Sequence, residues 1–248
     1  MIKTAQIAIV LANFCCVGQN TEFLLKDYSN PALLRNITAT TLYTDHSIIN
    51  PQFDIKSNKI GSVYRLWDRT FHTSYEQYGY KQYKEQKITV SSFQKISTNV
   101  YLGLNINLHR AAGLGFKKHH SISFDMGWNY QNKRYEIDLF IENPLNSAYV
   151  KNDIESRVII SGLYRWTAHL QSILKIEESY LTNSSRQHEL KYVYENAFIV
   201  SLIHNFANTQ YGFSLGYKKE PFQILTTYNS HPWANKLGFS LIYQVFDG

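Results

Sequence analysis

Apolar and polar residues alternate one for one along much of the chain. In VYLGLNINLH (100–109) every second residue is aliphatic, and the residues between are Tyr, Gly, Asn or His. The same period of two recurs in 121–130, 135–142, 211–218 and 237–245. Because successive side chains of a strand point to opposite faces, each segment predicts a β-strand with one apolar face and one polar or small face. Helical periodicity is almost absent beyond the first 35 residues.

This alternation predicts an all-β chain with about fourteen strands. The strands are expected at 37–46, 59–67, 70–81, 87–96, 99–109, 120–130, 133–142, 157–166, 168–178, 187–194, 197–205, 210–218, 221–229 and 236–246. Tight turns follow the even-numbered strands. Connections after odd-numbered strands are often longer, as at 110–119 and 143–156, with short exceptions near Lys84 and Ala207. Such a meander is typical of outer-membrane barrels, which have an even number of strands; because 73–86 alternates poorly, about twelve strands is the alternative.

The composition of the two faces indicates which face meets lipid. On most strands the non-aliphatic face carries Gly, Ser, Asn, Asp, Lys or Gln, whereas a soluble ligand-binding barrel would fill its interior with apolar side chains. The chain has 19 Tyr, 14 Phe and 4 Trp, and Tyr and Trp favour membrane interfaces. No window holds the roughly 18 apolar residues that a spanning helix needs. We therefore expect a single transmembrane, antiparallel, up-and-down β-barrel; an ordinary all-β protein is the alternative, because strands favour aromatic residues in general.

The first 18 residues have the layout of a secretory signal peptide. Lys3 precedes an apolar stretch that ends at Cys16, and small residues follow up to Gly18. This layout predicts removal of residues 1–18 during export, with a first core strand or helix as the alternative. Cys15 and Cys16 lie inside this segment, so we expect neither disulfides nor cysteine-bound metal in the mature chain. Loss of Lys3 removes one charge from the formal net charge of +6, no basic run remains, and nucleic acid is not an expected partner.

Residues 19–36 precede the barrel, which is expected to occupy residues 37–248. The segment carries five large apolar side chains, namely Phe23, Leu24, Leu25, Leu33 and Leu34. A solvated tail would expose them as an apolar patch, and Pro31 cannot donate a ladder hydrogen bond in a central strand. A barrel of about fourteen strands is wider than its wall side chains can fill. We therefore expect residues 19–36 to enter the lumen as a plug; a periplasmic terminus that binds another protein is the alternative.

Four short segments resemble, in the same order, parts of FadL-like barrels and of the PorV/PorQ-type outer-membrane proteins of Bacteroidota. They are DYSNPALL (27–34), YGYKQYKEQKITVSSFQKI (78–96), IENPLN (141–146) and YNSHPWANKLGFSLIYQVF (228–246). The resemblance implies a barrel of roughly fourteen strands whose N-terminal segment lies in the lumen. It also implies either service to a secretion machine or passage of apolar small molecules.

An inward row of opposite charges is the clearest candidate for a functional lining. The candidate lumen residues are Glu136, Asp138, Glu142, Arg157, Arg165, Lys175 and Lys191. The three acids share one face of 135–142, and the bases lie on later strands. Such charges pair across a barrel interior and stiffen it; an electrostatic constriction is the alternative.

The sequence offers little for catalysis. His119 and Ser121 share a face, at a spacing that a few outer-membrane phospholipases use. Alternation places both on the lumen side, whereas a lipid-cleaving site should face lipid, so we expect a polar rim. KKHH (117–120) lacks a spaced carboxylate partner for metal binding and is expected to be a solvated loop. GLGF (113–116) lacks the context of a nucleotide loop. We expect no catalytic, cofactor or metal site.

Together these patterns predict a non-enzymatic β-barrel that is exported through the periplasm to the bacterial outer membrane. Its expected partners are outer-membrane lipid and other envelope proteins. The first hypothesis for its function is an accessory or structural component of an envelope assembly that resembles type IX secretion. The alternative is a FadL-like passive transporter or pore for small apolar solutes. A lumen packed with paired charges favours the first, and an open or apolar path favours the second.

Overall fold

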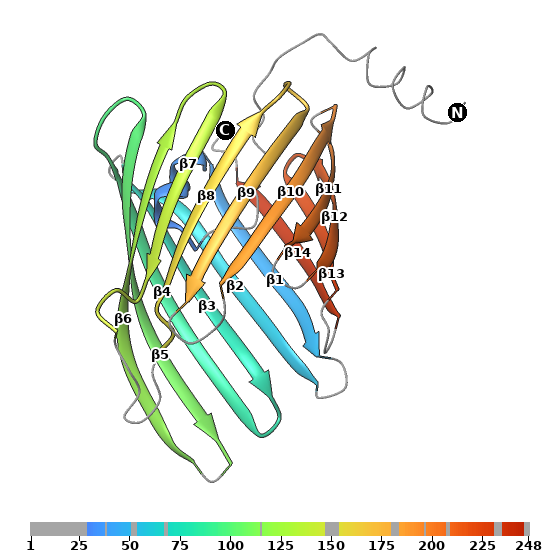
Figure 1. Cartoon of the computed structure of the whole chain (residues 1–248). Coiled ribbons are helices and arrows are strands. Elements are labelled where there is room, and N and C mark those ends of the chain that lie inside the picture. The colour runs from blue at the N-terminus through green and yellow to red at the C-terminus, as the bar shows by residue number, and fades with distance from the viewer. Residues whose placement is uncertain are drawn as a thin grey trace.

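The structure is a closed barrel of fourteen antiparallel strands (Figure 1). This computed structural model describes residues 29–37, 39–50, 54–66, 69–114, 116–146, 154–179, 184–195, 197–206, 209–230 and 235–245. The strands are β1 Thr40–Asn50, β2 Ile55–Leu66, β3 Arg69–Tyr80, β4 Tyr83–Lys95, β5 Val100–Gly113, β6 Phe116–Gln131, β7 Tyr135–Glu142, β8 Arg157–Arg165, β9 Leu170–Ser179, β10 Ser185–Tyr194, β11 Phe198–Asn205, β12 Gln210–Lys219, β13 Phe222–Asn229 and β14 Lys236–Val245. Each strand pairs with its neighbours in sequence, and β1 closes the barrel against β14. The predicted fold class is confirmed.

One short helix precedes the barrel. The 3-10 helix η1 (Pro31–Asn36) begins after Asn30, whose side chain accepts a hydrogen bond from the backbone N–H of Ala32. Pro31 suits the first position of a helix because its φ angle is already helical and its missing N–H would have no partner there. Among the described residues, no helix is long and apolar enough to cross a membrane.

The largest differences from the predicted strands lie in the hairpins of β1 with β2 and of β5 with β6. The predicted long connection at 47–58 is wrong, because β1 continues to Asn50 and β2 begins at Ile55. The predicted long loop at 110–119 is wrong, because β5 continues to Gly113 and β6 begins at Phe116. Ala111 pairs with His119 and Gly113 with Phe116, so the ladder continues where the polarity no longer alternates. KKHH (117–120) therefore belongs to β6. The turn between β3 and β4 is likewise at 81–82, a few residues before the predicted position.

The aliphatic face of 100–109 points out of the barrel. Leu102, Leu104, Ile106 and Leu108 are 43–58% exposed, whereas Asn105 and the neighbouring inward positions of β5 are buried. The outward aliphatic row from Val100 to Leu108 extends for about 27 Å along the strand at 3.4 Å per residue. This length suits the apolar band of a tilted strand in an outer-membrane barrel.

Outward aromatic side chains lie near both ends of the barrel. At the end with the short turns the ring pairs are Tyr64–Phe71 (5.9 Å), Tyr130–Tyr135 (5.8 Å), Tyr164–Trp166 (4.8 Å), Phe198–Tyr217 (4.9 Å) and Phe222–Tyr243 (5.1 Å) between centroids. At the opposite end they are His204–Tyr211 (4.8 Å) and Phe213–Tyr228 (5.4 Å). The turn-end rings are spread over strands from β2 to β14, whereas the loop-end pairs lie on β11 to β13. Outward aromatic rings at the edges of an apolar band are typical of barrels that sit in a membrane.

The two ends of the barrel differ in shape. β1 begins beside the last residues of β14, so both lie at the end with the short turns. At the other end, β5 and β6 project beyond their neighbours (Figure 1). The pairing of β6 with β7 covers only residues 125–131 of β6, because β7 has only 8 residues. We call these the turn end and the loop end.

Candidate functional site in the barrel lumen

The turn before η1 lies directly against a bare patch of the inner wall. Gly103 and Gly127 are cross-strand partners on β5 and β6. A Cβ atom on Gly103 would lie 2.5 Å from the backbone nitrogen of Ala32, and one on Gly127 would collide with the side chain of Asn30. Only glycine at both positions lets this backbone approach so closely. Asn105 adds a direct bond, because its Nδ2 donates to the carbonyl of Ser29 (2.9 Å).

Arg35 joins η1 to the strands on its other side. Its guanidinium donates to Glu136 (2.7 Å) and to Gln131, and it lies 4.7 Å from the ring centroid of Tyr101. Glu136 also pairs with Arg165 on β8 (3.2 Å). The side chains of Arg35 and Glu136 are each 7% exposed. This triad links η1, β7 and β8, and its two guanidiniums share the single carboxylate of Glu136.

The end of η1 packs into a small apolar cluster. Leu34 and Ile37 are buried against Tyr43 on β1, Val63 on β2 and Ile242 on β14. Leu33 is half-buried. The other three residues of the predicted plug, Phe23, Leu24 and Leu25, lie outside the described residues. Residues 29–37 thus contact strands on both sides of the closure between β1 and β14.

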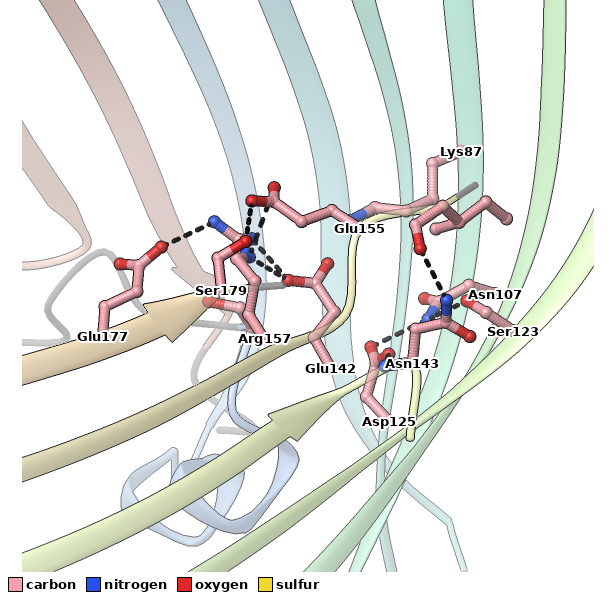
Figure 2. A network of polar contacts seen from close by, with 12 residues as sticks. Lys87, Asn107, Ser123, Asp125, Glu142, Asn143, Glu155, Arg157, Glu177 and Ser179 are labelled. Atoms are coloured by element: carbon pink, nitrogen blue, oxygen red, sulfur yellow. Dashed lines mark hydrogen bonds and ion pairs between the residues drawn. The ribbon is translucent and has the colours of Figure 1, made fainter. Parts of the chain in front are cut away.

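A second network fills the inner face of β4 to β6 nearer the loop end (Figure 2). Asp125 is its centre: one carboxylate oxygen accepts from the amides of Asn105 (3.0 Å) and Asn107 (2.8 Å), and the other accepts from the backbone N–H of Asn143 (3.1 Å). Asn107 also accepts from Thr89 (2.8 Å). Asn143 follows β7 with φ 49°, a backbone conformation that Asn tolerates well. The network therefore ties the start of the connection after β7 to the wall.

Charged side chains gather beside this network on β7 to β9. Arg157 donates to Glu142 through Nε (2.7 Å) and to Glu177 through Nη1 (3.0 Å), and Glu155 lies 3.8 Å away (Figure 2). Lys175 lies 3.7 Å from Glu177. The Arg157 side chain is 32% exposed, so solvent reaches this cluster.

The remaining candidates, Asp138 on β7 and Lys191 on β10, also lie on the inner wall. Asp138 accepts hydrogen bonds from Asn129 (2.5 Å) and Ser161 (3.2 Å). Lys191 is 3% exposed on β10. The structure thus brings Glu136 together with Arg165, and Glu142 with Arg157. Sequence reasoning missed Arg35, Glu177 and the Asp125 network. One signal in the sequence could have revealed the contact of η1 with the wall. If the turn between the two strands is placed at 114–115, Gly103 and Gly127 become cross-strand partners and form a patch without side chains.

The inner faces of β8 and β9 stay accessible. Every inward position of both strands is only partly buried. On β8 the inward residues include Ile159 and Leu163, and on β9 they include Ile173, which pairs with Leu163. These aliphatic side chains alternate with Arg157, Lys175 and the other charged or polar residues of the two strands. The accessible lining is therefore amphipathic.

His119 and Ser121 share the inner face of β6, as their spacing predicts, although the sequence predicts a loop at 117–120. His119 lies opposite Ala111 and Ser121 opposite His109, both on inward positions of β6. In the part of the chain that the structure describes, no group of three or more His, Cys, Asp and Glu side chains could hold a metal ion.

Comparisons with known proteins show the fold. No family model matches the chain, and no curated protein matches it. Among solved structures, a deltaS2S3 mutant of the monoaromatic hydrocarbon channel TodX has a TM-score of 0.67 at 8% identity, covering 88% of this chain and 93% of the other. A Pseudomonas aeruginosa FadL homologue has a TM-score of 0.58 at 10% identity, covering 88% and 93%. The KdgM porin has a TM-score of 0.52 at 8% identity, covering 83% and 99%. The chain shares the barrel fold of porins and FadL-like channels.

Proposed function

We propose that the protein is a passive channel of the bacterial outer membrane for small solutes with a large apolar surface. The observation that carries this proposal is the accessible, amphipathic inner face of β8 and β9, where Ile159, Leu163 and Ile173 alternate with charged residues. An apolar solute buries part of its surface when it contacts these aliphatic side chains, which favours its transfer from water. The charged side chains keep the rest of the path hydrated.

The fold supports the same location and class of function. The outward aliphatic band and the outward aromatic side chains at its edges suit a membrane barrel. The similar structures are named as hydrocarbon channels and a porin. The resemblance in sequence put an accessory role in an envelope assembly first; the accessible inner face favours the channel instead. Kinship with PorV/PorQ-type proteins stays a prediction.

In this proposal the path runs beside η1. The β5 and β6 side of the lumen is occupied by residues 29–37 and by the Asp125 network. A solute therefore follows β8 and β9, where apolar and charged side chains are both within reach.

A flux assay with adjacent substitutions tests this path. Ile173 points into the lumen and its neighbour Leu174 points outward and is 48% exposed. We expect Ile173→Trp to lower the entry of toluene or a similar monoaromatic solute into vesicles about tenfold or more, because the ring fills the path. Leu174→Trp should leave flux within about twofold, because the lipid face accepts Trp. Equal flux through both variants, or no flux of any small solute through the wild-type barrel, would refute the channel.

A further inference from the structure

The outward face of β2 to β6 changes from apolar to polar in a single step near the loop end. Ile60, Tyr75, Ile88, Leu108 and Ile122 form one outward row of register neighbours. The next outward row toward the loop end is Asn58, Gln77, Gln86, Arg110 and His120. In the proposed outer-membrane location, this step marks the surface of the apolar layer.

Four basic side chains gather on the outside just beyond this step. We call them the outer basic cluster: Lys84 on β4, Arg110 on β5, and Lys118 and His120 on β6. Arg110 lies opposite His120, Lys84 lies opposite Ala112, and Lys118 shares the outward face two residues from His120. Neighbouring strands are about 4.8 Å apart, so one anionic group can reach side chains from all three strands.

The outer basic cluster differs from the cationic side chains in the lumen in its lack of acidic partners. Arg35, Arg157 and Arg165 each pair with a carboxylate at 2.7–3.2 Å. Among the described residues, no ion pair involves any member of the outer basic cluster. The carboxylate of Asp54, at the same end of the barrel, is held by Lys56 (2.6 Å).

The side chain of Arg110 has a nitrogen atom that lacks a hydrogen-bond partner among the described residues. It is only half-buried, yet its Nε is shielded from solvent and has no hydrogen-bond partner in the described part of the chain. A shielded guanidinium N–H without an acceptor destabilises a structure unless a ligand supplies one. The planar guanidinium suits the two oxygens of a phosphate, and a lysine supplies a mobile positive charge beside it.

We propose that the outer basic cluster binds the phosphate groups of the lipid headgroup in the outer leaflet, which in an outer membrane belong to lipopolysaccharide. This inference rests on the proposed membrane location. The loop end is the outer one if the short turns are periplasmic, as in known outer-membrane barrels. A phosphate at this level meets the cations while the acyl chains of the same lipid lie along Leu108 and Ile122.

The test compares two triple variants of the full barrel that each lose one Arg and two Lys. The first, Lys84→Gln/Arg110→Gln/Lys118→Gln, removes the arginine and both lysines of the cluster and leaves His120. The control, Arg69→Gln/Lys133→Gln/Lys219→Gln, removes the same charges from exposed positions at the turn end. Binding of diphosphoryl lipid A is measured in detergent by native mass spectrometry, with dephosphorylated lipid A and inorganic phosphate as further probes.

We expect the cluster variant to bind diphosphoryl lipid A at least about tenfold more weakly, since each surface cation contributes to attraction of an anionic lipid. The control should stay within about twofold of wild type, and millimolar inorganic phosphate should not displace the lipid. Equal binding by both variants, equal binding of dephosphorylated lipid A, or displacement by phosphate would overturn the proposal.

Two further measurements keep the result interpretable. A gel of unheated and heated samples shows whether each variant is folded. If the triple variant does not fold, the single substitution Lys84→Glu, at an exposed side chain, replaces it.

Solute flux is measured separately in phosphatidylcholine vesicles. Lost flux with intact lipid A binding would refute only the channel, and intact flux with unchanged binding in the cluster variant would refute only the lipid site.

Discussion

The inner faces of β5–β6 and of β8–β9 follow the same alternation of side chains but have different roles. On β5–β6 the inward positions 103–107 and 123–129 are buried, whereas on β8–β9 every inward position keeps some exposure. The first face carries Gly and short amides or acids, which let backbone approach and bond to it. The second carries long aliphatic and charged side chains. Thus residue size on the inner face decides whether a barrel wall receives its own chain or leaves room for a solute.

Breaking the triad around Glu136 should have the largest effect on stability, because it joins the two faces. Glu136→Gln leaves the guanidiniums of Arg35 and Arg165 without their shared carboxylate, and Arg35 is only 7% exposed. We expect the free energy of unfolding to fall by about 3–5 kcal/mol. Urea unfolding followed by tryptophan fluorescence measures it. Glu178→Gln, at an exposed outward position of β9, is the control and should change stability by no more than about 0.5 kcal/mol.

A side chain added at the bare patch of Gly103 and Gly127 should separate η1 from the wall, with a smaller loss in the free energy of unfolding. Gly127→Val would drive its side chain into Asn30, and we expect a loss of about 1–3 kcal/mol. Residues 29–37 should also become sensitive to protease. Gly162→Val is a matched control on β8, because a Cβ there meets nothing within 4 Å. Similar proteolysis of the two variants would show that η1 is not held by this patch.

Changing the accessible side should alter selectivity more than stability. Arg157→Gln leaves Glu142, Glu155 and Glu177 with less positive charge near them. Because the Arg157 side chain is 32% exposed, we expect a stability change of about 1 kcal/mol or less. The lumen near the loop end becomes more negative, so the reversal potential in a salt gradient should shift toward cation selectivity. An unchanged reversal potential would place these carboxylates away from the path.

The sequence predicted the strands and their faces because that signal is local. A period of two in 100–109 is sufficient to identify a strand, and the composition of its faces shows which one meets lipid. The signal ended where β5 and β6 project beyond the apolar band, since side chains there no longer separate into two environments. The turn between these strands was therefore missed, although the ladder continues through Ala111 and His119.

The site was harder to predict because its contacts depend on register and depth. Alternation assigned Glu136 and Arg165 to the inner face, but their pairing follows from the alignment of β7 with β8 and from Arg35, 101 positions away. Lys175 lies beside Glu177 of its own strand, which had not been singled out. Period alone also cannot tell buried Asn107 from accessible Ile173, because the difference arises from what covers each one.

Thiol accessibility in the two faces tests the central claim most directly. With Cys15 and Cys16, the only cysteines of the sequence, replaced by Ser, single variants Ile173→Cys and Asn107→Cys are reconstituted and treated with a membrane-impermeant thiol reagent. We predict rapid modification of Ile173→Cys with loss of solute flux, and slow modification of Asn107→Cys, a position only 1% exposed. Equal modification rates at the two positions, or unchanged flux after modification of Ile173→Cys, would contradict the account.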